Sequence, residues 1–265
     1  MRDQFMNYTF LVEFEEYRRK KIIQDHQPSG EVYAHMIDLL FCMGYCKGKL
    51  IEDKNHWIYT IQDVAQFYFM ESAYSFRVLQ TLLLTGNFSY ASIILRTMLD
   101  SFAAYRFYMN KKDGNGYVKF INRKSTRSWK DVYDYLSVGF YEHQYSLLSN
   151  SVHSNPITHH IYRLSGISDK KQNYATDDVS IDFYSGLYNQ TIHLFKGIFK
   201  MFFDIFPENT FENECHTNLA KSVMEYIRGD ILYRLNKFPK QEIMINEYNE
   251  LTKDFKDLGI DFNGN

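Results

Sequence analysis

Apolar side chains recur at helical spacing over two long segments in the first half of the chain. The first runs from about residue 57 to 84, and the second runs from Ser89 to Tyr108. Between them, Gly86 is placed to follow one helix and Ser89 is placed to cap the next, so the connection is short. Two helices joined this tightly lie side by side, and the pattern therefore predicts an antiparallel helical hairpin over about residues 57–84 and 89–110.

Helical periodicity also covers most of the chain outside this hairpin. The chain has 265 residues but only 13 glycines and 4 prolines, and so few helix breakers favour an all-α protein, a multi-helix bundle. We expect a bundle domain at residues 51–258, an N-terminal helical extension (residues 1–50) packed on it, and a loose tail at residues 259–265. The further helices are expected at about residues 1–28, 31–45, 117–122, 128–136, 140–152, 179–206, 214–235 and 240–258.

The second helix of the hairpin carries one oppositely charged pair on an otherwise apolar segment. Arg96 and Asp100 are four residues apart, about 40° on a helical wheel, and they share a stripe with Ala103 and Phe107. A polar seam this narrow is typical of a central helix packed on most sides, so the pair should be at least partly buried. Because pairing only partly offsets the desolvation of two charges, we expect a third polar group to approach from another helix.

Charge, cysteine content and hydropathy restrict the classes of protein. The formal net charge of -2 argues against a generally basic nucleic-acid binder but leaves local basic patches open. Three cysteines, an odd number, without a signal peptide favour a reducing cytoplasm. No stretch reaches about 18 uncharged apolar residues, so we expect no membrane span. In the nearest candidate, residues 191–206, two lysines and an aspartate interrupt the apolar run; we interpret it as a core or dimer-interface helix rather than a membrane-surface helix.

A basic segment follows the hairpin. Its side chains could bind the phosphate groups of RNA, with Trp129 and Tyr133 available to stack on bases. The alternative is a solvated connection between helices, and the sequence leaves both interpretations open. The segment contains five cations and no acid, namely Lys119, Arg123, Lys124, Arg127 and Lys130.

Histidines are concentrated after this segment. One predicted helix carries Glu142, Ser146, Ser149 and His153 on a single line, at spacings of four, three and four residues. His153 stands at the end of that helix, where the helix dipole favours the cationic imidazolium, so it could donate a proton or complete the buried pair. Four histidines fall within eighteen residues here, but the chain has no Glu-x-x-His pair of the kind that di-metal helical bundles use. We therefore expect neither a metal nor another cofactor.

Two short motifs resemble a group of poorly characterised prokaryotic helical proteins. One is the run TGNFSYASIILRTMLDSFAAYRFY, with an acid four residues after an arginine. The other, about fifty residues on, is YSLLSNSVHSN, with serine and histidine four apart. This group is generally regarded as related to the HEPN superfamily, whose all-helical members include metal-independent ribonucleases of toxin and phage-defence systems. The similarity covers about residues 60–155, and the matching positions are Arg96, Asp100, Tyr145, Ser149 and His153.

The resemblance implies an RNA-cleaving or RNA-binding protein, with one departure from the superfamily pattern. HEPN nucleases usually carry an arginine, then four to six intervening residues, then a histidine on the same helix, whereas Arg96 is followed by Asp100 and the histidine comes from another helix. In a nuclease, Arg96 would stabilise the phosphorane charge, His153 would move a proton, and Asp100 would orient or tune one of them. Tyr145, Ser149 and the cations of the basic segment would then contact the substrate.

Two functional hypotheses remain open from the sequence. The first is a HEPN-like ribonuclease, a toxin or phage-defence effector of the cytoplasm, which would be a homodimer because such sites commonly form across a dimer interface and could be controlled by a regulatory partner protein. The second is a non-catalytic helical binding module for a nucleotide, an RNA end or a partner protein. In such a module, Arg96, Asp100, Ser149 and His153 would form a hydrogen-bonded network with a structural role. The lack of a histidine after Arg96 on the same helix favours this second hypothesis.

Overall fold

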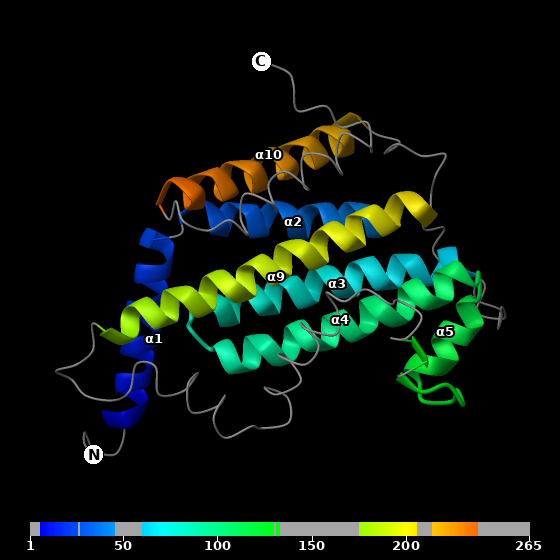
Figure 1. Cartoon of the computed structure of the whole chain (residues 1–265), viewed down its shortest axis with the longest axis horizontal. Coiled ribbons are helices and arrows are strands. Elements are labelled where there is room, and N and C mark those ends of the chain that lie inside the picture. Colours follow the sequence, from blue (N-terminus) through cyan, green and yellow to red (C-terminus); the bar gives the residue numbers. More distant parts are fainter. Residues whose placement is uncertain are drawn as a thin grey trace.

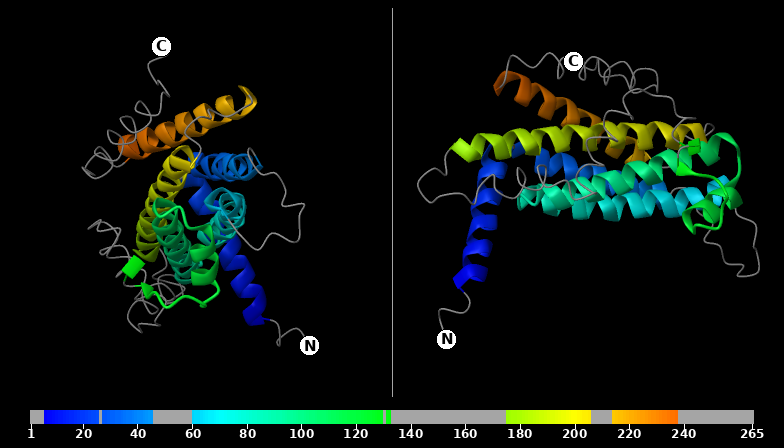
Figure 2. Two further views of the ribbon diagram at one scale, coloured as in Figure 1. Left: turned by 90° about the vertical axis from the view of Figure 1, so that its right-hand side faces the viewer. Right: turned by 60° about the horizontal axis from the view of Figure 1, so that its bottom comes forward.

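The structure, a computed structural model, describes residues 6–25, 27–45, 60–129, 131–132, 175–205 and 214–237. These residues form seven helices and no strand, which confirms the predicted all-α bundle. The long helices α10, α2, α9, α3 and α4 follow one another from top to bottom of Figure 1, while α1 stands steeply against them (Figure 2). In chain order the helices are α1 (Met6–Asp25), α2 (Gln27–Tyr45), α3 (Ile61–Leu84), α4 (Phe88–Asn110), α5 (Gly114–Ile121), α9 (Ala175–Ile205) and α10 (Glu214–Lys237).

Helices α3 and α4 form the predicted hairpin. Thr60 caps the start of α3, where the Asp63 N–H donates to Thr60 Oγ1 at 3.1 Å and the Thr60 N–H donates to Asp63 Oδ2 at 2.7 Å. This reciprocal pair of bonds is a capping box, and it satisfies two backbone donors that the helix itself leaves unpaired. Residues 57–59 of the predicted helix lie outside the described part of the chain.

The turn between the two helices depends on Gly86, which has a φ of +74°. The N–H groups of Gly86 and Asn87 donate to the carbonyls of Leu83 at 3.1 Å and Leu82 at 2.8 Å, the two bonds of a Schellman motif. The predicted role of Ser89 as N-cap is wrong. Asn87 holds the N-cap position, and Ser89 is a buried residue of the first turn of α4.

Helix α1 is attached to this same turn. Arg18 Nη1 donates to the Gly86 carbonyl at 3.1 Å, and Asn87 Nδ2 donates to Glu15 Oε1 at 3.2 Å. A Cβ at Gly86 would lie 2.5 Å from Arg18 Cδ, so a glycine is required here both for its φ and for this contact. The side chain of Asn87 therefore bonds to α1 and does not cap α4.

Aromatic side chains from α2, α3 and α9 build much of the core. Phe76 of α3 meets Phe195 of α9 with ring centroids 6.1 Å apart, and Tyr33 of α2 meets Tyr188 of α9 at 5.5 Å. All four residues are buried. Ring pairs at these separations and tilts add to the stability that apolar burial supplies, and they explain where much of the 17% aromatic content is used.

Helix α9 contains most of the apolar segment that was predicted as a core or dimer-interface helix. Its residues Ile192, Phe195, Ile198, Phe199 and Phe202 are all buried among the other helices. The segment is therefore a core helix of the bundle. No described helix is both long and apolar enough to cross a membrane.

Helix α2 contributes to the same core. It lies along α3 and also contacts α10, and its residues Val32, Met36, Leu40 and Met43 are buried. The predicted boundary between an extension at residues 1–50 and a bundle domain stays a prediction, and so does the tail at residues 259–265, which lies outside the described residues.

We predict opposite effects of alanine at two glycines of α9. At Gly186 a Cβ would meet no atom within 4 Å, so Gly186→Ala should raise the free energy of unfolding by about 0.5–1 kcal/mol through helix propensity. At Gly197 a Cβ would lie 2.9 Å from Cζ of Phe102, which is fully buried in α4. Gly197→Ala should therefore lower the free energy of unfolding by about 1–2 kcal/mol. Urea unfolding followed by circular dichroism measures both, and equal stabilisation by the two changes would contradict the packing of α9 on α4.

Candidate functional site

The Arg96 and Asp100 side chains form a direct ion pair on α4. Arg96 Nε donates to Asp100 Oδ1 at 3.0 Å, and the two side chains are 10% and 25% exposed. This confirms the expectation that the pair is at least partly buried. The bond to Nε also holds the plane of the guanidinium group in one orientation, because arginine presents its donors in a rigid fork.

Burial changes the acidity of the Asp100 carboxyl. Desolvation raises the pKa of Asp100 above its ordinary value, and the hydrogen bond and positive charge of Arg96 only partly oppose this rise. The carboxyl therefore holds its proton to a higher pH than an exposed aspartate does. Perturbed carboxyl groups of this kind are frequent at functional sites, although structural ion pairs produce them too.

Several predicted site residues lie outside the described part of the chain. These are His153, Tyr145 and Ser149, together with Lys130, the last cation of the basic segment, and Tyr133, which follows it. Their predicted roles, including the approach of His153 to the ion pair, stay predictions.

The basic segment is described from its start to Trp129. Lys119 lies in the last turn of α5, and Arg123, with a φ of +56°, lies in the turn that follows it. Lys119, Arg123, Lys124 and Arg127 are all exposed. Charged side chains on such a solvated turn can reach the phosphates of a nucleic acid.

The basic segment folds back onto the same face of α4 that carries the ion pair. The guanidinium carbon of Arg127 lies 5.4 Å from the ring centroid of Phe107, and Lys111 Nζ lies 4.1 Å from it. Phe107 shares the helical stripe of Arg96 and Asp100 and lies about 10 Å along the helix from Asp100. The structure therefore brings the basic segment and the ion pair onto one side of α4, although they are far apart in sequence.

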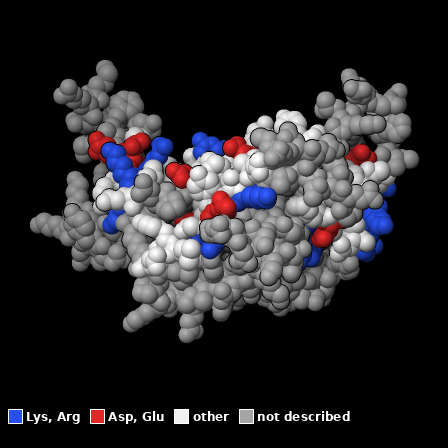
Figure 3. All heavy atoms as spheres, turned by 90° about the horizontal axis from the view of Figure 1, so that it is seen from above, with Lys and Arg blue, Asp and Glu red and all other residues white. Residues whose placement is uncertain are grey.

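Trp129 is placed beside this cationic region. Its ring meets Phe120 of α5 with centroids 4.7 Å apart, and 42% of the residue stays exposed. An aromatic ring that stays partly exposed can stack on a nucleic-acid base. Seen from above, positive and negative side chains are interspersed over the bundle, whereas blue spheres predominate at the right-hand edge, where α5 lies in Figure 1 (Figure 3).

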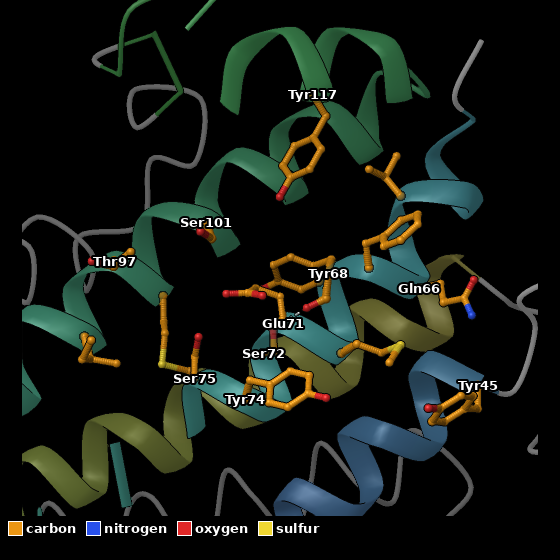
Figure 4. A pocket seen from close by; sticks show the side chains of 15 residues that line it. Tyr45, Gln66, Tyr68, Glu71, Ser72, Tyr74, Ser75, Thr97, Ser101 and Tyr117 are labelled. Atoms are coloured by element: carbon orange, nitrogen blue, oxygen red, sulfur yellow. Dashed lines mark hydrogen bonds between the residues drawn. The ribbon is translucent and has the colours of Figure 1, made fainter. Parts of the chain in front are cut away.

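A second site, which sequence reasoning missed, lies on the other side of α4. It is a cavity of about 790 Å³ between α3, α4, α5 and the end of α2, shown from close by in Figure 4. Four residues of α4 line it, and two of these, Ile94 and Met98, are turned about 160° from Arg96 around the helix axis. The described residues that line it include Phe67, Glu71, Tyr74, Met98, Ser101 and Tyr117.

The sequence of α3 contains a pattern that could have indicated this cavity, but the pattern does not show which side of the helix faces the core. Phe67, Glu71, Tyr74 and Val78 follow one another at spacings of four, three and four residues, which places an acid on an apolar stripe. Helical periodicity assigns Phe67, Tyr74 and Val78 to apolar faces, yet these residues are 57%, 58% and 48% exposed. The core is built from the other side of α3, which is also apolar, so the pattern alone could not tell the two sides apart.

A second arginine and histidine of the chain lie close together in sequence, on or next to α1. Arg19 and His26 are separated by six residues, which is within the spacing described for HEPN nucleases. Arg19 is an exposed residue of α1, and His26 lies outside the described residues.

No protein-family model, no curated protein and no solved structure matches the chain. The resemblance to HEPN proteins therefore stays a prediction. Among the residues that the structure describes, no group of three or more His, Cys, Asp or Glu side chains is arranged to hold a metal ion.

We predict that Asp100 makes stability fall as pH rises above 3.8, the ordinary pKa of this carboxyl. Because the native pKa is raised, the native state keeps a proton that the unfolded state has already lost, and each step up in pH then favours the unfolded state. Between pH 3.8 and the raised native pKa, the free energy of unfolding of wild type should fall relative to that of Asp100→Asn. Above the native pKa the carboxyl is ionised in both states, and the difference should stay constant. Urea unfolding at a series of pH values measures the difference.

The matched control is Asp204→Asn, an exposed aspartate of α9. If wild type instead gained stability relative to Asp100→Asn as pH rose, attraction to Arg96 would outweigh desolvation and the prediction would be wrong.

Proposed function

We propose that the chain binds RNA along the face of α4 that carries Arg96, Asp100 and Phe107, and cleaves it there as a HEPN-like ribonuclease. The observation that supports this proposal is the position of Arg127 and Lys111 over the Phe107 ring. It joins a cationic, solvent-exposed region to a buried arginine on one side of one helix. An anionic polymer that follows this face would meet cations first and the buried pair about 10 Å further along.

Each group has a distinct chemical role in the proposal. The exposed side chains of Lys119, Arg123, Lys124 and Arg127 would contact phosphates, and Trp129 would stack on a base. Arg96, held by Asp100, would stabilise the additional negative charge of the phosphorane. His153 would transfer a proton to or from the 2′-hydroxyl or the leaving oxygen.

The HEPN resemblance extends the proposal to the biological setting. It favours a toxin or phage-defence effector that acts in the cytoplasm as a homodimer and is restrained by a regulatory partner protein. These are proposals that rest on the resemblance alone.

A second proposal is RNA or nucleotide binding without cleavage. The observation that favours it is the burial of Arg96 and its bond to Asp100, which is also what a satisfied structural network looks like. The two proposals share the binding face and differ only in whether a bond is broken.

We predict that RNA binding depends on the basic segment through its charge. Lys124→Gln/Arg127→Gln should weaken the binding of a single-stranded RNA and reduce the slope of log K against log salt by about 1.4, because each lost phosphate contact removes about 0.7. Fluorescence anisotropy at several salt concentrations measures both quantities. The control, Lys200→Gln/Lys221→Gln, removes two exposed lysines of α9 and α10 and should leave the slope unchanged. Equal losses for the two double variants would show nonspecific attraction.

We predict metal-independent cleavage of RNA that requires His153. Purified protein in excess chelator should cleave tRNA or total RNA, and His153→Ala should lower the rate by about 100-fold or more, as loss of general acid–base catalysis does. His35→Ala serves as the control, because His35 stacks on Tyr226 of α10 at 4.3 Å, away from α4. Equal cleavage by wild type and His153→Ala would exclude His153 from the site, and RNA binding without cleavage would favour the second proposal.

A further inference from the structure

We propose that the cavity between α3 and α4 binds a small amphiphilic amine, a molecule with an apolar or aromatic body and one protonated amino group that pairs with Glu71. The proposal is independent of RNA binding, since the cavity and the cationic region lie on different sides of α4. It rests on the size of the cavity, on its apolar walls and on the carboxylate of Glu71, which no cation among the described lining residues accompanies.

The size and the walls of the cavity suit a small organic molecule. Its volume of about 790 Å³ falls within the range of roughly 300–1,000 Å³ that is usual for small-molecule sites. Phe67 and Tyr74 of α3 stand at its edge, both more than half exposed, and Met70 and Met98 line it. Methionine side chains adapt to ligands of different shape, and exposed aromatic side chains around a hollow are typical of a binding site.

Among the described residues that line this cavity, the charged group is Glu71. Its side chain lies near the centre of Figure 4 and is exposed, and it makes no hydrogen bond or ion pair with any residue that the structure describes. Among the described lining residues there is no lysine, arginine or histidine that could neutralise it. A cationic ligand would supply the missing charge, whereas a phosphate or a carboxylate would be repelled.

Two hydroxyl groups that line the cavity also favour a ligand that donates hydrogen bonds. Ser72, next to Glu71 in Figure 4, donates its proton to the Tyr68 carbonyl at 2.7 Å, and Thr97 of α4 donates its proton to the Ile93 carbonyl at 3.0 Å. Each hydroxyl has a single proton, so what these oxygens offer to a ligand is acceptor capacity. An ammonium group has three donors and no acceptor, which matches this set of partners.

Aromatic rings form a rigid wall beside the carboxylate. Tyr68 stacks on Tyr105 with centroids 4.5 Å apart, and Tyr117 of α5 meets the Tyr105 ring edge-on at 5.2 Å. The Tyr117 hydroxyl is directed toward the part of the cavity that holds Glu71 (Figure 4). Burial, and then the charge of Glu71, raises the pKa of Tyr117, so its phenol stays neutral. Neutral phenol rings attract a nearby cation through their faces.

Two probes with the same body and different charge test the proposal on the full chain. Phenylbutylamine is protonated at neutral pH, whereas phenylbutanol has the same phenylbutyl group without the charge. We expect wild type to bind the amine about tenfold more tightly than the alcohol, as a charge-assisted contact provides. Dissociation constants come from titrations followed by ligand-observed NMR.

Substitutions identify the groups responsible. Glu71→Gln keeps the shape of the side chain and should abolish the preference for the amine while leaving the affinity for the alcohol unchanged. Glu225→Gln, at an exposed glutamate of α10, should retain the preference of wild type. Ser101→Trp, which places a large ring in the cavity, should weaken the binding of both probes, and circular dichroism confirms that each variant is folded.

Three results would overturn the proposal. They are equal affinity of wild type for the two probes, a preference for the amine that survives Glu71→Gln, and no binding of either probe up to its solubility limit. The RNA affinity of Glu71→Gln should equal that of wild type, so a failure of this proposal is distinguishable from a failure of the proposed RNA binding.

Discussion

The left-handed backbone at Gly86 is the constraint on which much of this bundle depends. Its φ of +74° closes the Schellman turn, and this turn holds α3 and α4 side by side in opposite directions. At the same turn, Arg18 of α1 donates to the Gly86 carbonyl and Asn87 donates to Glu15 of α1, and these two bonds attach α1. Once the hairpin is formed, each of its helices has one side covered by its partner, and α2 and α9 then pack their aromatic residues against what remains apolar.

This arrangement gives α4 two sides of opposite electrostatic character. On one side a buried arginine lies in line with the cations that contact Phe107. On the other side the cavity presents a carboxylate, together with two hydroxyl groups whose protons are donated to backbone carbonyls. The net charge of -2 therefore says little about which ligands the chain could select. Cations lie on one side of α4 and the Glu71 carboxylate lies on the other, about the width of one helix apart.

The helices were predictable because their signals are local. Periodicity located α3, α4, α9 and α10 within a few residues, and the narrow seam on α4 predicted the burial of Arg96. The features that escaped prediction are set by distant residues. Ser89 is not the cap because Asn87, whose side chain bonds to Glu15 of α1, takes that position. The spacing of residues along the chain reveals neither the contact of Arg127 with Phe107 nor the exposure of Phe67.

The raised pKa of Asp100 bears on how the proposed RNA site would operate. Arg96 is held by Asp100 while the carboxyl is ionised. If an RNA phosphate approached, its negative charge would further disfavour the ionised carboxyl, which burial already disfavours. A protonated Asp100 carries no negative charge and attracts the guanidinium less strongly. Arg96 would then pair with the phosphate instead of with the carboxyl. The same desolvation that makes the pair costly to fold would then make it responsive to an anion, which a fully solvated pair on the surface would not be.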